Sequence, residues 1–234
     1  MKAGSARVRK RRALPFHDIG REQKRRFILK AAAAAFGEKG FHAVTVKDIA
    51  ERAGIAHGTF YLYFKGKKDV YLELSQELQS QIMQVILPGG GVEVMAEGAD
   101  LAAIVRDRLV GLGELFEREA NFARVFVYRT PGTDPEFEEQ RRKFISDVTD
   151  GIAAVLRVGA ERGFFRRHDP RVAAMCLVGS MEMVIESWLQ SSAEPTGPSL
   201  SEMMDEAARF FVPALLETNA VRSRQGGRAR TAAT

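Results

Sequence analysis

The chain of 234 residues contains very little of what secreted, metal-binding or membrane proteins need. It has a single cysteine, Cys176, so no disulfide can form within it, and its four histidines are scattered without the spacing of a zinc site. No apolar run approaches the roughly 18 residues of a membrane span, and no apolar segment follows the basic N-terminus as it would in a secretory signal. We therefore expect a cytoplasmic protein that has no membrane partner and no metal.

The motifs by which many enzymes hold nucleotides are also missing. Neither GxGxxG nor GxxxxGK[ST] occurs, and Gly111-Leu112-Gly113 falls inside an expected helix, where it indicates flexibility or close packing. No serine, histidine and acid are arranged in a way that suggests a triad. We therefore expect a protein that is not an enzyme and carries no cofactor.

Charge is divided unevenly along the chain, although the net formal charge is only +5. Residues 1–70 contain 17 Lys and Arg against 6 Asp and Glu, a formal charge of +11, whereas residues 71–220 carry −10. The last 14 residues add four arginines. A basic end joined to an acidic body is typical of a protein with one polyanion-binding face, and a merely solvated basic surface is the alternative.

The segment Thr45–Phe64 predicts two short helices joined by a tight turn. Thr45 is a suitable N-cap, and Asp48 three residues later places a carboxylate beside the free N–H groups of the first turn. Gly54 is the expected left-handed residue that ends the first helix. A helix, a glycine turn and a second helix form a helix-turn-helix, whose second helix can lie in the major groove of DNA.

The run HGTFYLYFKGKKDVY that ends this segment resembles the signature of TetR-family transcriptional regulators. There a G-T-x-Y-x-[HY]-F run ends the recognition helix and an F-x-x-K step opens the next helix. The matching residues here are Gly58, Thr59, Tyr61, Tyr63, Phe64 and Lys67, within a similarity that covers about residues 27–74. Two positions depart from the pattern: Ala56 replaces the common serine N-cap, and His57 replaces a common Lys or Arg.

The resemblance implies a division of the DNA contacts between phosphates and bases. Phosphate contacts are expected from Thr45, Tyr61, Tyr63, Lys67 and Lys68, the two lysines lying in a first helical turn whose free N–H groups also favour an anion. Base readout is expected from His57, Gly58 and Thr59, with Gly58 allowing a close approach of the backbone. Packing against the core of the DNA-binding head is the alternative for the two tyrosines.

The rest of the chain predicts helices only, at about 21–38, 65–87, 99–119, 122–128, 136–162, 170–190 and 200–219. The expected fold is all-α, with an N-terminal three-helix helix-turn-helix DNA-binding head and a larger helical ligand-binding and dimerisation domain. The expected boundaries are a disordered basic arm at 1–20, the head at 21–68, the body at 69–222 and a disordered basic tail at 223–234. The arm either keeps the protein soluble or contacts DNA beside the main site.

In the body the sequence contains no motif, and it gives only candidate residues for an effector cavity and a dimer interface. Side chains that could line an apolar effector cavity, although each is more often core, are Phe116, Phe122, Phe126, Tyr128, Phe144, Met175, Met181 and Trp188. Charged residues that could meet an anionic effector such as an acyl-CoA, although such faces are usually just solvated, are Arg129, Arg141 and Arg142. Residues of two apolar helices that resemble the family's four-helix dimer interface are Val178, Ile185, Trp188, Phe210, Phe211 and Leu215.

Together these features predict a ligand-responsive transcriptional regulator that binds a pseudo-palindromic double-stranded DNA operator as a homodimer. The prediction is a repressor, associated with the nucleoid in the cytoplasm and released by a small, largely apolar effector. One alternative is a thiol-responsive regulator in which oxidised Cys176 disturbs the dimer, although its apolar neighbours indicate a buried and inert thiol. The other alternative is a protein-interaction module without specific DNA binding.

Overall fold

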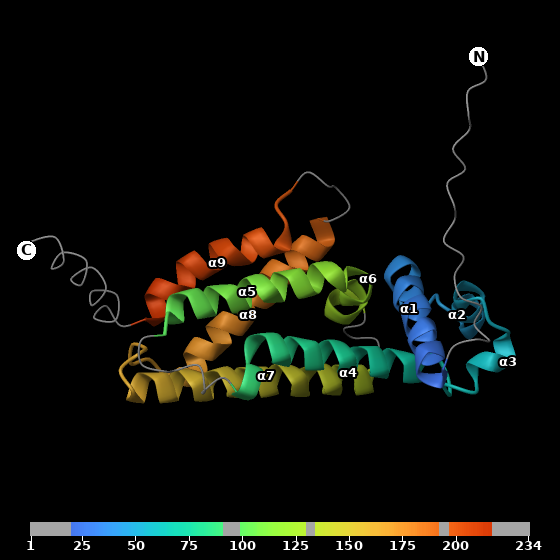
Figure 1. Ribbon diagram of the computed structural model, residues 1–234, viewed down its shortest axis with the longest axis horizontal. Helices are drawn as coiled ribbons and strands as arrows, with labels where there is room; N and C mark the ends of the chain where they lie inside the picture. Colours follow the sequence, from blue (N-terminus) through green and yellow to red (C-terminus); the bar gives the residue numbers. More distant parts are fainter. Residues whose placement is uncertain (1–19, 91–98, 130–133, 192–196, 217–234) are drawn as a thin grey trace, which may run out of the picture.

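The computed structural model describes residues 20–90, 99–129, 134–191 and 197–216, and all its regular elements are helices (Figure 1). The described residues contain no strand, and their one isolated β-bridge joins Phe165 to Leu216. The prediction of an all-α fold is therefore confirmed. The predicted basic tail, and the predicted arm apart from Gly20, lie outside the described residues.

Three helices form a head at one end of the molecule: α1 (Arg21–Lys39), α2 (Val46–Ala53) and α3 (His57–Phe60) (Figure 1). Phe60 and Phe64 face inward as their spacing of four residues requires, with exposed fractions of 0% and 2%. The other fully buried side chains of this core are Ile28, Ala32, Phe36, Val44 and Ile49. The head is thus small but has an apolar core of its own.

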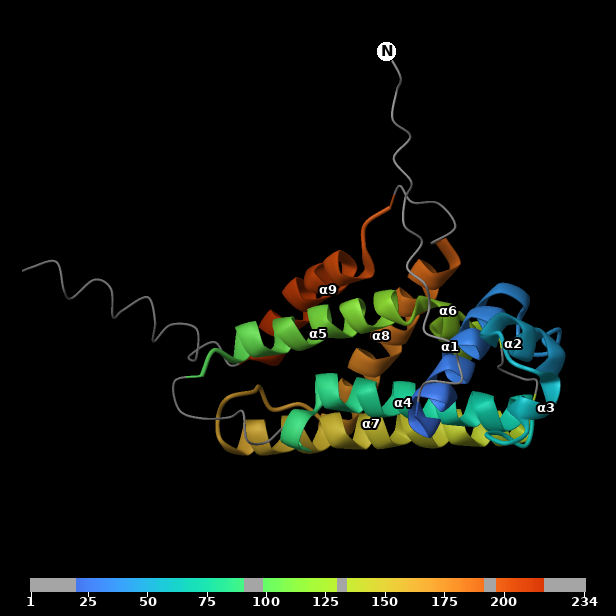
Figure 2. The same cartoon turned by 45° about the vertical axis from the view of Figure 1, so that its right-hand side comes forward.

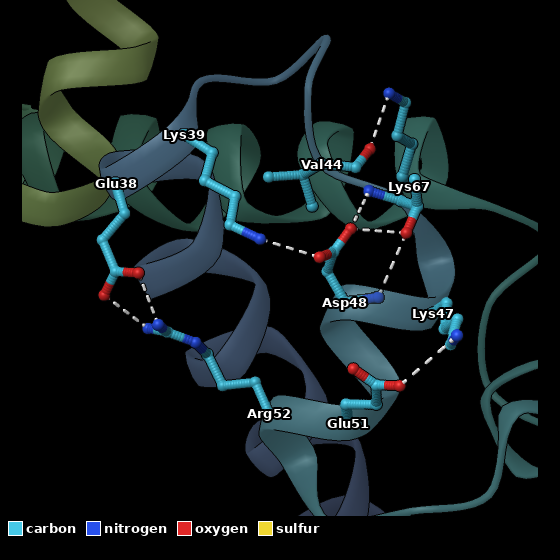
Figure 3. A network of polar contacts seen from close by, with 9 residues as sticks. Glu38, Lys39, Val44, Lys47, Asp48, Glu51, Arg52 and Lys67 are labelled. Carbon is cyan, nitrogen blue, oxygen red and sulfur yellow. Dashed lines mark hydrogen bonds and ion pairs between the residues drawn. The ribbon is translucent and has the colours of Figure 1, made fainter.

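The helix α2 is held at both ends by the residues that the sequence indicated. The Thr45 hydroxyl accepts a hydrogen bond from the Asp48 backbone N–H at 3.2 Å, and the Asp48 carboxylate accepts one from the Thr45 backbone N–H at 2.8 Å (Figure 3). Lys39 donates to the same carboxylate at 2.8 Å. Its ammonium group and the bonds from Thr45 hold the pKa of the Asp48 carboxyl well below its usual value. Gly54 ends the helix with a φ of 68°.

The recognition helix α3 is only four residues long, and its N-cap, Ala56, has no side chain that could bond the first N–H groups. The chain then continues as a turn, in which Tyr63 and Phe64 donate backbone N–H groups to the Phe60 carbonyl. The departure from serine at position 56 therefore coincides with a short helix. The exposed front of the head is this helix together with the turn that follows it.

Six further helices build the body: α4 (Lys67–Ile86), α5 (Leu101–Arg118), α6 (Ala120–Arg124), α7 (Pro135–Glu161), α8 (Pro170–Ser191) and α9 (Leu200–Leu215). A 3₁₀ turn at Pro88–Gly90 follows α4, and a π-helical turn at Val125–Arg129 follows α6. Predicted boundaries hold to within two residues for most of these helices. The prediction that the last helix reaches residue 219 is wrong, because Leu216 is extended and bridges to Phe165.

The long helices of the body lie in two layers along the long axis of the molecule. Figures 1 and 2 both show α5 and α9 side by side on one side and α4 and α7 on the other, with α8 crossing between them. The helix α4 begins at the head and runs along the body, and α7 continues beyond the end of α4 (Figure 1). Helix α4 thus joins the two parts directly, and α7 begins beside its first turn, where Lys68 pairs with Asp134.

The close packing of α5 on α9 depends on a glycine. A Cβ atom at Gly113 would lie 2.7 Å from the backbone of Ser201, whereas one at Gly111 would meet only a Val85 methyl group at an ordinary 3.5 Å. The Glu117 carboxylate, one turn further along α5, accepts hydrogen bonds from the N–H and hydroxyl of Ser201. The two glycines that the sequence placed inside one helix therefore have different roles, and only Gly113 is needed for packing.

We predict that Gly113→Ala destabilises the protein by about 1–3 kcal/mol, because the added methyl group would overlap a backbone that cannot move independently of α9. The matched control, Gly111→Ala, should be neutral or stabilising by up to about 1 kcal/mol, because alanine favours the helix and the site has room. Chemical denaturation followed by circular dichroism measures both. Equal stability of the two variants would contradict the packing role.

We also predict a pH-dependent benefit of the Asp48 carboxylate, measured as the difference in unfolding free energy between the protein and Asp48→Asn. Because the folded-state pKa is lowered, this benefit is complete well above the unfolded-state pKa of about 3.9 and is lost as the pH falls below it. Thermal unfolding at pH 7, 5 and 3 tests the sign. A difference that grows toward pH 3 would show that the assignment is wrong.

Candidate nucleic-acid interface and effector cavity

The front of α3 and the turn after it carry exposed side chains that nothing in the head covers. His57 and Gly58 are exposed, Thr59 is half-buried, and Tyr61 is 51% exposed, with its ring 5.3 Å from the His57 ring in an edge-on contact. A Cβ at Gly58 would meet nothing within 4 Å. Packing against the residues that the structure describes therefore does not explain this glycine, and the predicted base-reading residues share one open surface. The sequence did not point to Leu62, which is 69% exposed beside them.

Two other predicted phosphate contacts lie at the edge of this surface. Thr45 is exposed at the N-terminus of α2, where free N–H groups favour an anion, but its hydroxyl already belongs to the capping box. The half-buried Tyr63 packs against the core of the head. Sequence reasoning missed Lys47 in the first turn of α2, whose side chain is 76% exposed and only loosely paired with Glu51, at 3.8 Å. Its place two residues after the N-cap Thr45 was the signal that the sequence offered.

The two lysines predicted to bind phosphate both have partners inside the protein. The Lys67 ammonium donates to the backbone carbonyls of Phe41, His42 and Val44, at 2.8–3.0 Å, and burial lowers its pKa. These bonds use all three of its N–H donors. Lys68 pairs with the carboxylates of Asp134 and Glu136 at the start of α7, which raise its pKa. These contacts show that both lysines hold the start of α4 in place, a role that the motif alone did not reveal.

A cavity with a volume of about 190 Å³ lies inside the described part of the body. Four of the predicted lining residues do line it: Phe116, Phe126, Phe144 and Met181. The remaining wall is mostly aliphatic and comes from α4, α5, α7 and α8, with contributions from Phe165 and Leu215. The cavity thus lies between the two layers of helices, and one of its walls is the helix that continues into the head.

Three of the other four predicted lining residues are placed elsewhere. Phe122 is buried beside Tyr71, Met175 is 58% exposed on the outside of α8, and Trp188 is half-buried against the core. For these three the prediction is wrong, because a helical pattern cannot tell which of several apolar faces meets a void. The side chain of Tyr128 lies outside the described residues.

Three charged side chains reach the cavity wall. Arg141 on α7 is paired with Glu182 on α8 at 2.8 Å, so this pair is neutral overall. Arg108 on α5 donates to the backbone carbonyl of Ile86 at 2.8 Å, and burial lowers its pKa from the ordinary value. The sequence predicted Arg141 but missed Arg108. Arg142 pairs with Glu139 on the surface, and the side chain of Arg129 lies outside the described residues.

The predicted dimer residues have three different surroundings. Val178, Ile185 and Leu215 are buried and line the cavity, which leaves them little surface for a partner; Trp188 and Phe211 are half-buried against the core. Phe210, by contrast, is 76% exposed. The other large apolar side chains exposed on α8 are Val172, Met175 and Met183, at 57%, 58% and 66%. These four residues form the exposed apolar group of α8 and α9.

Cys176 lies among these residues and is exposed in the single chain, so the prediction of a buried thiol is wrong. The helix α8 that carries it is long and apolar enough, with a mean hydropathy of 1.5 over its most apolar stretch, to pass for a membrane span. That composition is weak evidence, because one face of α8 lines the cavity within the protein.

Comparisons with known proteins agree with this architecture. Residues 28–74 match the family described as bacterial regulatory proteins, tetR family. The transcriptional repressor KstR2 of Mycobacterium tuberculosis is 31% identical over 151 residues, which cover 59% of this chain and 68% of that repressor. The solved structure of the fatty acid degradation regulator FadR from Bacillus halodurans superposes with a TM-score of 0.68 and 23% identity, covering 82% of this chain and 95% of that one.

The FadR structure from Bacillus subtilis in complex with stearoyl-CoA superposes with a TM-score of 0.65 at 22% identity, covering 81% of this chain and 98% of that one. At this level of identity the solved structures show the shared fold. The match of the head, the identity to KstR2 and the arrangement of a helix-turn-helix on a larger helical body agree with one another. The chain belongs to the TetR family of transcriptional regulators.

Proposed function

We propose that this protein is a repressor that binds a pseudo-palindromic operator as a homodimer and leaves it when a small, largely apolar effector binds the cavity. The observation that carries the proposal is that α4 joins both sites: its first turn holds the helix-turn-helix through Lys67, and its later residues line the cavity. A ligand that favours one position of α4 would thereby change the affinity for DNA, and DNA would change the affinity for the ligand by the same factor.

At the DNA, base readout falls to His57, Gly58 and Thr59, and phosphate contacts fall to Tyr61 and to the N-terminus of α2 around Thr45. We add Lys47 to the phosphate contacts, because it is exposed in that first turn and only weakly paired. Tyr63 remains a phosphate contact only through its hydroxyl, since its ring packs inward. We leave Lys67 and Lys68 out, because their ammonium groups already have partners.

Repression and effector release are supported by relatives rather than by this chain itself. KstR2 is named a transcriptional repressor, and FadR of Bacillus subtilis was solved with stearoyl-CoA, a ligand with a long apolar chain. An apolar wall of helices around a cavity is what such a chain or a ring would require. We accordingly place the protein on the nucleoid in the cytoplasm and propose no enzymatic activity, cofactor or disulfide for it.

The decisive experiment is selection of random DNA duplexes by the purified protein at about 150 mM salt with competitor DNA, followed by sequencing. Recovery of a palindrome with half-sites about one helical turn apart would support the proposal and supply a probe for effector screening. Recovery of no motif, with binding that vanishes as salt rises, would contradict it and favour a sequence-blind interaction with polyanions.

We predict that Gly58→Ala folds at least as stably as the unchanged protein but binds the selected operator about tenfold or more weakly. The added methyl group would meet none of the described residues within 4 Å, yet it would lie on the surface where the backbone is proposed to approach the bases. Fluorescence anisotropy with labelled operator measures the affinity, and Gly111→Ala in the body is the matched control. Unchanged affinity of Gly58→Ala would remove this glycine from the interface.

We predict that the exposed apolar group of α8 and α9 is the dimer surface. Met183→Glu or Phe210→Glu should then give a monomer with the chain mass of 25.9 kDa in light scattering, because a desolvated carboxylate would oppose association. Leu62→Glu, at a residue equally exposed but in the head, should remain dimeric at the same concentration. Retention of the dimer in both α8 and α9 variants would place the interface elsewhere.

A further inference from the structure

Arg108 differs from the other charged residues of the body in where its charge lies. It sits on α5 at the wall of the cavity, partly buried, and its one hydrogen bond joins Nη1 to the backbone carbonyl of Ile86 at 2.8 Å. In the described part of the chain no carboxylate lies within ion-pair distance of its guanidinium. An arginine stays protonated at neutral pH, so the apolar cavity is bordered by an unneutralised positive charge.

The hydrogen bond to the Ile86 carbonyl accounts for only part of the reason why an arginine lies at the cavity wall. Ile86 is the last residue of α4, and a donor at that carbonyl satisfies an acceptor that the helix itself leaves open. This contact occupies one of the five N–H donors of the guanidinium. A neutral amide could cap the same carbonyl at a smaller desolvation cost, so capping does not explain why a full charge borders the cavity.

The second arginine at the cavity wall, Arg141, shows by comparison what an ion-paired arginine looks like in the same place. Arg141 has the same opportunity to meet a ligand, but Glu182 neutralises it at 2.8 Å. Arg106, two residues before Arg108 on α5, is also paired, with Asp205. The net charge at the cavity therefore comes from Arg108. Apart from the Arg141–Glu182 pair, the rest of the wall is apolar, with Leu109 and Leu112 following Arg108 along the same helix.

From this arrangement we infer that the cavity takes an amphipathic acid, whose carboxylate or comparable oxyanion pairs with the free donors of Arg108 while its ring or chain fills the apolar remainder. A guanidinium can bind a carboxylate through two parallel hydrogen bonds, which strengthens and orients the pair. A cavity of about 190 Å³ exceeds the roughly 150 Å³ that holds a benzene ring, so it has room for an apolar ring or short chain of at least that size. This inference rests on the proposed function, because it names the class of the effector.

The test compares acids with alcohols of equal apolar size, using isothermal titration of the full chain without DNA. The probe pairs are octanoate and 1-octanol, decanoate and 1-decanol, and 2-naphthoate and 2-naphthol. The expected result is roughly tenfold tighter binding of the acid in at least one pair, as a charge-assisted contact would provide. In Arg108→Gln, which keeps a donor for the Ile86 carbonyl, the preference for the acid should disappear while the alcohol still binds.

Arg108→Lys should retain part of the preference, because it keeps the charge but not the fork of donors. Arg118→Gln is the matched control on the same helix, at a residue outside the cavity, and should leave the preference unchanged. The inference is overturned if no probe pair shows a preference for the acid, or if Arg108→Gln keeps it. DNA is absent from this titration, whereas operator selection involves no ligand, so failure of one experiment is distinguishable from failure of the other.

Discussion

The bonds from the Lys67 ammonium to three backbone carbonyls are the contact on which the rest of the architecture depends. They join the first turn of α4 to the segment between α1 and α2, which contains Phe41, His42 and Val44. Those carbonyls lie outside any helix, so no helical N–H group satisfies them, and the Lys67 ammonium is the donor that does. The segment held by Lys67 leads into α2, and α2 leads through a short turn into α3. The orientation of the recognition surface therefore depends on α4.

The head is also packed on the body through contacts that leave little freedom. Tyr71 of α4 lies 4.0 Å from the Phe137 ring of α7 and 5.5 Å from the Phe122 ring of α6, which places one aromatic cluster under the head. A Cβ at Gly37 of α1 would lie 2.4 Å from the Asn121 carbonyl oxygen, so α1 and α6 touch through their backbones. A shift of α6 would therefore have to move α1 as well, so the position of the head depends on the packing of the body.

Much of the head could be predicted from sequence because its signals are local. The N-cap Thr45 with Asp48, and Gly54 with its positive φ, each depend on residues within one helical turn, and all three behave as their chemistry requires. Lys67 shows the limit of the same reasoning. Its position in the motif suggested a phosphate contact, but its actual partners lie 23 to 26 residues earlier in the chain, and no local pattern reveals a contact at that separation.

The body was less predictable because an apolar residue there can meet three different surroundings. Phe144 lines the cavity, Phe122 fills the core and Phe210 faces outward, yet the sequence around each is an ordinary amphipathic helix. Spacing gives the face of a helix but not what the face meets. The missed residue, Arg108, illustrates the same limit, since a lone arginine on a helix is usually solvated.

The composition of α8 follows from having to satisfy two surroundings at once. Val178 and Ile185 on one face border the cavity, while Met175 and Met183 on the other are more than half exposed in a single chain. A helix between a void and solvent would need only one apolar face, so the second apolar face agrees with the dimer surface proposed above. With a second copy on that face, α8 would separate the effector from the dimer surface by the width of one helix. Any ligand that displaces α8 would then also change the dimer contact, and with it the spacing of the two heads.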